Sequence, residues 1–397
     1  MISAASRPYI DASVPVLREH GLAVTTVFYR NMFAAHPELT NLFNMGNQAS
    51  GKQQHSLASA VFAYAANIDN AGALAPVVKR IVHKHVSVGI TPAHYPIVGH
   101  HLLGAIKEVL GEAATPELIA AWAEAYGALA DALIAAETEM YGVAGVAAGE
   151  TRPMRVTEVE RQSANVLSIR LVPEDGGALP PFAAGQYVSV AVDLGAGRRQ
   201  LRQYSLSDAP GKDSLRISVK REDADDNAPA GEVSNWLHAN VKAGSVLQLT
   251  HPFGEFTPDT ESIDPVVLLS AGVGITPMIA ALNRIAAINP ERRVIFAHAA
   301  IDADHHAHQA DIAAAKARMP YLNVVTFHEQ PGDAAGVLPG RMDLARLPKW
   351  PLSETNVYMC GPLGFMQAQW DALLAAGAPA ARLHREVFGP DLLDNLL

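Results

Sequence analysis

The chain has 397 residues, of which 49% are hydrophobic, so it can form two or three domains with packed cores. Its formal net charge of −10 argues against nucleic acid or an anionic membrane surface as the main partner. The single cysteine, Cys360, excludes an intramolecular disulfide framework and fits a reducing compartment, so we expect a cytoplasmic protein.

The chain is expected to contain neither a signal peptide nor a membrane span. Residues 1–10 lack the basic and then apolar layout of a signal peptide. The most apolar run, 266–282, is interrupted by Gly272, Gly274 and Pro277, which predicts a buried strand, a turn and a helix instead.

The hydrophobic pattern changes twice along the chain and predicts three domains. Residues 1–141 have helical periodicity, and the small, uncharged residues that follow indicate a linker over 142–152. Short alternating stretches over 153–260 predict an antiparallel β-barrel. Over 261–397 strands alternate with helices, which predicts a doubly wound α/β domain with a parallel sheet.

In the helical part, His85 follows Val78, Ile81 and Val82 at helical spacing, so the histidine shares an apolar face. Most histidines in such a position are core residues with satisfied hydrogen bonds. A second stripe, however, runs from Gln53 through Leu57, Val61 and Tyr64 and offers a partner face. The two faces suggest a pocket that holds a flat apolar cofactor through one imidazole, as haem is held. No Cys-x-x-Cys-His sequence exists, so such a haem would be haem b held without covalent bonds.

A carboxylate lies on the stripe Trp122, Tyr126, Leu129, Leu133, Glu137 and Met140. A carboxylate on an apolar face is costly unless it is paired. The alternative is that Glu137 lies near a frayed helix end and faces solvent.

In the predicted barrel, the segment Arg202-Gln203-Tyr204-Ser205 is preceded by Tyr187 and followed by a turn over 231–235 that opens a helix. The amides at a helix N-terminus can bind phosphate, although a turn of this kind can also be a simple helix cap.

In the predicted α/β domain, Gly272 and Gly274 follow an apolar strand and would let the backbone approach a diphosphate. Thr276 is expected to cap the next helix, with Pro277 at its first position. Cys360-Gly361-Pro362 ends another strand at the edge where open α/β sheets bind ligands.

Taken together, these residues resemble the flavohemoglobin family, in which a globin is fused to a ferredoxin-NADP reductase-like module. The resemblance covers essentially the whole chain. It is carried in the first domain by Phe28, Tyr29, Phe43, Gln53, Leu57, Lys84, His85, Tyr95 and Glu137, and in the reductase part by the three segments above and by Glu386, Phe388, Gly389 and Pro390.

For the first domain, the resemblance implies that His85 is the proximal iron ligand and that Tyr29 and Gln53 hydrogen-bond oxygen on the distal side. Phe43 would pack on the porphyrin beside Phe28, and Leu57 would restrict the distal space. Tyr95 and the outer nitrogen of His85 would be the partners of Glu137. Whether a lipid or an inhibitor enters the distal pocket is left open.

For the reductase part, the resemblance implies FAD and NADH, with NADPH as the alternative. Arg202 would meet the flavin diphosphate, Tyr204 would stack on the flavin ring and Ser205 would bond it, with Gln203 and Tyr187 beside them. Gly231, Val233 and Ser234 would bind phosphate, and Phe388 would cover the flavin. Glu386 and Lys84 would lie between flavin and haem, and Cys360 near the nicotinamide.

Two features near residue 300 concern ligands. Asp302 and Asp304 would repel the 2′-phosphate of NADPH, although both could be solvated while Arg318 or Arg341 binds that phosphate. The cluster His305, His306 and His308 suggests a metal, but a solvated loop is the interpretation we favour.

The resemblance implies a nitric oxide dioxygenase: NAD(P)H reduces FAD, FAD reduces haem, and oxygen and nitric oxide yield nitrate. One alternative is a haem-flavin reductase of peroxides or other small acceptors. Another is a gas-binding sensor whose reductase only keeps the iron ferrous. We expect a monomer with small-molecule partners.

Overall fold

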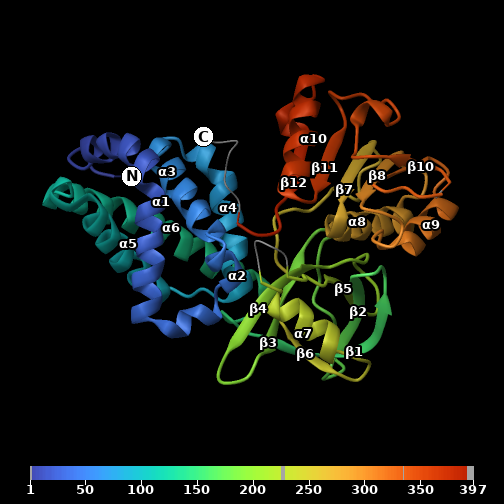
Figure 1. Ribbon diagram of the computed structural model, residues 1–397, viewed down its shortest axis with the longest axis horizontal. Helices are drawn as coiled ribbons and strands as arrows, with labels where there is room; N and C mark the ends of the chain where they lie inside the picture. The colour runs from blue at the N-terminus through green and yellow to red at the C-terminus, as the bar shows by residue number, and fades with distance from the viewer. Residues whose placement is uncertain (1, 225–228, 334, 391–397) are drawn as a thin grey trace.

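The structure is a computed structural model that describes residues 2–224, 229–333 and 335–390, and its elements form a helical part, an antiparallel sheet and a parallel sheet in chain order (Figure 1). The helices of the first part are α1 (Arg7–Ala35), α2 (Met45–Ala49), α3 (Lys52–Ala66), α4 (Ala71–Val88), α5 (His94–Leu110) and α6 (Pro116–Ala144), with 3₁₀ turns at Pro37–Asn41 and Gly111–Ala113.

Local signals explain where the two long helices near His85 begin and end. Helix α4 ends at Gly89, whose φ of 85° is readily adopted only by glycine and whose amide donates to the His85 carbonyl. Helix α6 begins after Thr115, whose hydroxyl accepts from the Leu118 amide, and it continues to Ala144, into the segment predicted as a linker.

Among the described residues, α6 is the one helix whose length and apolar composition would allow it to cross a membrane, and this alone is weak evidence. The helix packs against α1, α4 and α5. It buries Trp122, Leu133 and Glu137 there, so its apolar character is explained by its place in the core of the helical part.

The second part is a closed antiparallel barrel. Its strands are β1 (Arg152–Arg161), β2 (Val166–Pro173), β3 (Tyr187–Asp193), β4 (Arg199–Ser205), β5 (Leu215–Lys220) and β6 (Val246–Leu249), in the order β4-β3-β6-β1-β2-β5. Leu206, directly after β4, bridges to Ile217 on β5, so the two ends of this order meet. Helix α7 (Glu232–Asn240) packs Val233 and Leu237 into the barrel core.

The third part is a parallel sheet covered by helices on both faces. Its strands are β7 (Val266–Ala271), β8 (Val294–Ala300), β9 (Leu322–His328), β10 (Val337–Pro339), β11 (Asn356–Cys360) and β12 (Leu383–Glu386), in the order β10-β9-β8-β7-β11-β12. Helices α8 (Ile275–Ile288) and α9 (Gln309–Arg318) share one core cluster, and α10 (Leu363–Ala375) belongs to the other. The remaining 3₁₀ turns are Gly272–Gly274, Leu344–Arg346 and Ala380–Arg382.

The prediction for the start of α8 is wrong in detail. The helix begins at Ile275, directly after the 3₁₀ turn Gly272–Gly274, so Pro277 is its third residue and not its first. Thr276 is not the cap: its hydroxyl donates to the Val273 carbonyl. The 3₁₀ turn already supplies a helical backbone, so the helix needs no side-chain cap.

The prediction of a solvated histidine loop is also wrong for two of its three members. His306 and His308 are buried, whereas the His305 side chain is one third exposed. His306 packs between His298 of β8 and His328 of β9, with ring centroids 4.6 and 5.6 Å away. No group of three or more potential ligand residues that could hold a metal ion occurs in the described ranges.

We predict that the buried His306 makes the parallel-sheet domain sensitive to acid. Burial and the neighbouring His328 lower the pKa of His306 from 6.5 to about 4. The unfolded chain therefore binds more protons than the folded chain between these values, and the free energy of unfolding falls as the pH drops from 6.5 to about 4. The expected loss is about 3 kcal/mol.

This loss can be measured by hydrogen exchange of the β8 and β9 amides in urea at several pH values. The variant His306→Gln, which cannot titrate in this range, should reduce the pH dependence, while His298 and His328 keep their own contributions. The control His305→Gln removes the more exposed neighbour and should keep the slope. A wild-type slope in His306→Gln would contradict the prediction.

Candidate functional site

Three side chains from three helices meet on one side of α4. His85 Nδ1 lies 2.7 Å from Glu137 Oε1 on α6 and 3.2 Å from the hydroxyl of Tyr95 on α5. The Tyr95 hydroxyl donates to the same carboxylate oxygen at 2.5 Å. The structure thus brings together the three residues that the resemblance paired, over separations of 10, 42 and 52 residues in the chain.

Glu137 is only 2% exposed, so the alternative in which it faces solvent at a frayed helix end is wrong. Burial and the hydrogen bond to Glu137 raise the pKa of Tyr95, so the phenol stays protonated and keeps donating. With Nδ1 held by Glu137 and Tyr95, Nε2 is the nitrogen of His85 that can bind a metal.

The surroundings of His85 fit a flat apolar cofactor. The His85 side chain is 34% exposed although it belongs to an apolar face. Val78 and Ile81 on the same helix are half-buried, and so are Phe43 and Leu57. A haem site requires an apolar lining and one imidazole nitrogen that can bind the iron, and these residues provide both.

Aromatic rings surround Tyr29 on α1. Phe28 and Phe43 contact its ring edge to face, with centroids 4.8 and 5.8 Å away, and Phe33 stacks on it at 5.7 Å. Burial raises the pKa of Tyr29, so its hydroxyl is a neutral donor at any physiological pH. Gln53 and Gln48 are polar neighbours of this hydroxyl, and both act to lower its pKa against the larger effect of burial.

Gln48 was not predicted from the sequence. It lies on the short helix α2 and is 9% exposed, and its side-chain oxygen accepts from Gln54 Nε2 at 3.0 Å. The one local signal is Asn44, whose side chain accepts from the Gly46 and Asn47 amides and so caps the helix that carries Gln48.

The opposite face of α4 contacts the barrel. Arg80 forms an ion pair with Glu255 at 3.0 Å, and His83 Nδ1 accepts from the Gly254 amide at 3.0 Å. Gln203 Nε2 donates to the hydroxyl of Ser87 at 2.5 Å. Arg80, His83 and Ser87 follow one another at helical spacing, so the sequence itself carries a signal for this second face.

Lys84 lies where all three parts of the chain meet. Its Nζ is 5.1 Å from the ring centroid of Tyr187 on β3 and 3.8 Å from the buried Glu386 on β12. It also donates to the Val387 carbonyl at 3.4 Å. The next residue, Phe388, is 45% exposed, which is unusual for an aromatic side chain and fits a surface that covers another ring.

The predicted flavin residues are brought together at the end of β4. Arg202 is half-buried and donates to the Gln200 side chain at 3.0 Å, while Ser205 is buried. Tyr204 packs against the barrel core, and burial raises its pKa. Gly231 precedes α7 without a side-chain cap, and Ser234 donates back to its carbonyl, so amides at the start of α7 remain for an anion.

The glycine turn after β7 lies against the end of β11. A Cβ atom at Gly274 would be 2.6 Å from the Gly361 nitrogen, so only glycine fits there. Cys360 pairs with Ser270 on β7 and with Glu386 on β12. Burial raises the pKa of the Cys360 thiol, which argues against a nucleophile.

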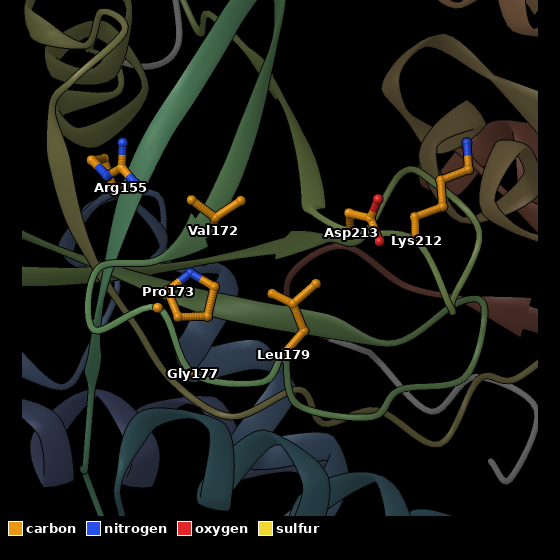
Figure 2. Close-up of a pocket in the computed structure, with 8 residues that line it drawn as sticks. Arg155, Val172, Pro173, Gly177, Leu179, Lys212 and Asp213 are labelled. Atoms are coloured by element: carbon orange, nitrogen blue, oxygen red, sulfur yellow. The ribbon is translucent and has the colours of Figure 1, made fainter.

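Two hollows on the barrel lie apart from these residues. Figure 2 shows the first, of about 410 Å³, with Arg155, Leu179, Lys212 and Asp213 around it. The second, of about 660 Å³, lies between residues 179–184, 210–212 and 257–261 and Arg284. None of the predicted site residues lines either hollow.

Comparison with known proteins bears directly on this geometry. The globin family matches residues 26–133, and the oxidoreductase NAD-binding domain family matches residues 268–371. A flavohemoprotein from Chromobacterium violaceum is 51% identical, with 98% of both chains covered. The chain belongs to the flavohemoprotein family.

Other members of the family and a solved structure extend this result. A flavohemoprotein from Bordetella pertussis is 48% identical over 98% of this chain and 99% of its own. The crystal structure of a flavohemoglobin from Malassezia yamatoensis with bound FAD and heme is similar with a TM-score of 0.87 and 29% identity, over 98% of this chain and all of the other. The three-part architecture is therefore that of the family.

We predict that Tyr95→Phe destabilises the helical part. The substitution removes the hydroxyl that donates to the buried Glu137 and leaves that carboxylate with one donor fewer. A lost hydrogen bond to a buried charged group costs about 1.5–3 kcal/mol. Urea denaturation should show this loss, and Tyr9→Phe, which changes an exposed tyrosine of α1, should leave stability within about 0.5 kcal/mol of the wild type. Equal urea midpoints for Tyr95→Phe and Tyr9→Phe would refute this prediction.

Proposed function

We propose that this chain is an NAD(P)H-dependent nitric oxide dioxygenase that uses FAD and non-covalent haem b. The observation that carries the proposal is that α4 holds His85 against Glu137 and Tyr95 on one face and contacts the barrel through Lys84 and Ser87 on the other. A solved FAD/NAD-binding domain of a nitric oxide dioxygenase from Vibrio cholerae O1 biovar El Tor supports it, with 40% identity over 61% of this chain and all of the other, at a TM-score of 0.56.

In this proposal, when bound, the nicotinamide supplies hydride, the flavin converts it to single electrons, and haem supplies the oxygen chemistry. His85 holds the iron through Nε2. Glu137 accepts from Nδ1 and makes the imidazole a stronger electron donor, which favours activation of oxygen over its storage. Tyr95 holds the carboxylate in place.

On the distal side, Tyr29 would donate a hydrogen bond to a diatomic ligand, with Gln53 and Gln48 as the polar side chains next to the phenol. The ring cage of Phe28, Phe33 and Phe43 fixes the tyrosine and keeps water out. Leu57 limits the space that remains.

In the reductase part, Arg202 and the amides at the start of α7 bind the flavin diphosphate. Tyr204 and Phe388 pack on the flavin ring, and Ser205 bonds it. The Gly272–Gly274 turn binds the nicotinamide diphosphate, and Cys360-Gly361-Pro362 lines the nicotinamide position. Lys84 and Glu386 lie between the flavin side and the haem side.

We further propose domain boundaries at 141, 152 and 260, a monomeric state and a cytoplasmic location. The buried, unpaired Cys360 supports a reducing compartment.

The decisive test of the function is the steady-state consumption of nitric oxide by the purified holoprotein. Consumption should need both oxygen and NADH, and nitrate should form in equal amount. Consumption that continues without oxygen would point to a different acceptor chemistry and overturn the proposal.

We predict that His85→Ala abolishes stoichiometric haem binding while flavin stays bound. Nδ1 of His85 is bound by Glu137 and Tyr95, which leaves Nε2 for the iron, and the flavin residues lie in another domain. The ferrous carbon monoxide spectrum measures the haem, and His100→Ala, which changes an exposed histidine of α5, is the control. An unaltered spectrum in His85→Ala would rule out this ligand.

We predict that Tyr29→Phe speeds the release of oxygen from the reduced protein by roughly 10- to 100-fold, because a hydrogen bond to a partly charged ligand contributes about 1.5–3 kcal/mol. Flavin reduction by NADH should not change. Stopped-flow absorbance measures both rates. Tyr64→Phe removes a hydroxyl that bonds to the Ala125 carbonyl and serves as the matched control. Release of oxygen from Tyr29→Phe at the wild-type rate would contradict the proposed hydrogen bond from Tyr29 to the ligand.

We predict that NADH is preferred over NADPH. Asp302 accepts from both the amide and the ring of His305, so it stays in the loop after β8 as a fixed negative charge beside Asp304. Two carboxylates there repel a 2′-phosphate. The ratio of kcat/KM for the two cofactors at equal ionic strength measures the preference, and a ratio of one or an inverted ratio would contradict it.

A further inference from the structure

A buried polar cluster joins the parallel-sheet part to the barrel. On the barrel side it contains Arg216 and Ser218 of β5 and Asp208, which follows β4. On the other side it contains Asn283 of α8 and, at the start of α9, His308 and Asp311. Figure 1 shows α8 and α9 beside the end of the barrel where β5 lies. We call these six residues the interdomain latch.

The latch is connected by hydrogen bonds throughout. Arg216 Nη2 is 3.1 Å from Asp311 Oδ1, and Asn283 Nδ2 donates to both Asp208 Oδ1 and Asp311 Oδ1 at 2.9 Å. His308 uses both ring nitrogens: Nδ1 is 2.9 Å from Asp311 Oδ2 and Nε2 is 3.0 Å from the Ser218 hydroxyl. This pattern fits a neutral imidazole that donates from Nδ1 and accepts at Nε2.

The latch holds charge in the protein interior. Asp208, Arg216 and His308 are 2%, 3% and 0% exposed. Asp208 also forms ion pairs with Lys212 at 2.6 Å and with Arg170 at 3.2 Å. Burial alone would raise the pKa of Asp311, but the hydrogen bond from His308 and the charge of Arg216 outweigh it and hold that pKa below its usual range. Buried ion pairs contribute little net stability, because desolvation offsets their attraction, whereas a wrongly docked arrangement would leave charges unpaired.

The backbone at the latch is also unusual. His308 has a φ of 62°, in the left-handed region that non-glycine residues seldom adopt. Such a conformation persists only where the surroundings enforce it. Here the bonds to Ser218 and Asp311 do so, and the Ala164 amide of the barrel donates to the Asp304 carbonyl in the same loop at 2.7 Å.

Helix α8 links the latch to the nicotinamide turn. The Gly272–Gly274 turn directly precedes α8, and Asn283 lies in the body of this helix, which is buried along most of its length. A rigid helix held at Asn283 therefore fixes the turn relative to the barrel. Hydride transfer needs donor and acceptor atoms within about 3–3.5 Å, and a shift of about 1 Å can cost 100-fold in rate.

We propose that the interdomain latch sets the distance between nicotinamide and flavin, and that Asp311, His308 and Asn283 are positioning residues for hydride transfer. The proposal rests on the proposed function of the reductase part. None of the six latch residues is among those placed at the flavin or at the nicotinamide ring, so loosening the latch should slow the transfer itself and leave the binding of NADH unchanged.

The test is anaerobic stopped-flow reduction of the flavin in the full-length holoprotein over a series of NADH concentrations. Asp311→Asn should lower the limiting rate by about 10- to 100-fold, with the same apparent Kd for NADH and the same flavin content. The long-wavelength absorbance of stacked nicotinamide and flavin should weaken in parallel. Asp371→Asn, which changes an exposed carboxylate of α10, is the matched control and should behave as the wild type.

A second variant decides the matter if Asp311→Asn does not fold. His308→Asn suits the left-handed backbone, since asparagine tolerates it, but the shorter side chain cannot reach Ser218. A limiting rate within twofold of the wild type in the folded variant, or a loss that lies wholly in Kd, overturns the latch. Failure of NADH to reduce the flavin of the wild-type protein would instead overturn the proposed function.

Discussion

One helix, α4, makes side-chain contacts inside the helical part and outside it at the same time. Residues one apart on a helix point in directions about 100° apart, so consecutive residues face different partners. His85 reaches Glu137 and Tyr95 inside the helical part, and its neighbour Lys84 reaches Tyr187 and Glu386 outside it. The helical part cannot turn about α4 without breaking contacts on both faces, so Nε2 of His85 keeps a fixed relation to the barrel.

Polar side chains cross each of the domain boundaries, beside apolar clusters that also span them, such as Phe253 with Val82 and Val86. Arg80 and Glu255 join the helical part to the barrel, and Lys84 and Glu386 join it to the parallel-sheet part. The interdomain latch joins the barrel to that sheet. Apolar contact is tolerant of sliding, whereas a partly buried ion pair loses most of its attraction when its geometry changes. These polar contacts therefore favour one arrangement of the three domains over other arrangements that would bury a similar surface area.

Burial of ionisable groups has opposite consequences at two places in the chain. Glu137 is buried with two hydrogen-bond donors, and its charge is directed at His85. His298, His306 and His328 are buried without a carboxylate bonded to any of their ring nitrogens among the described residues, and burial lowers the pKa of each. The first arrangement supports chemistry at the imidazole, while the second keeps imidazoles neutral and makes the fold sensitive to acid.

The sequence by itself determined the elements and the faces they bury. The 3.6-residue spacing through Val78 and His85 and the break at Gly89 each report a local geometry that few residues control, whereas β5, whose residues alternate between apolar and polar, is buried on both sides. The pairing of His85 with Glu137 came from the family resemblance, since 52 residues separate them. The tertiary structure alone decided the position of Gln48 beside Tyr29, the burial of His306 and His308, and the latch between Arg216 and Asp311. A periodic pattern shows that a face is buried but not what lies against it, because that partner is set by packing between segments far apart in the chain.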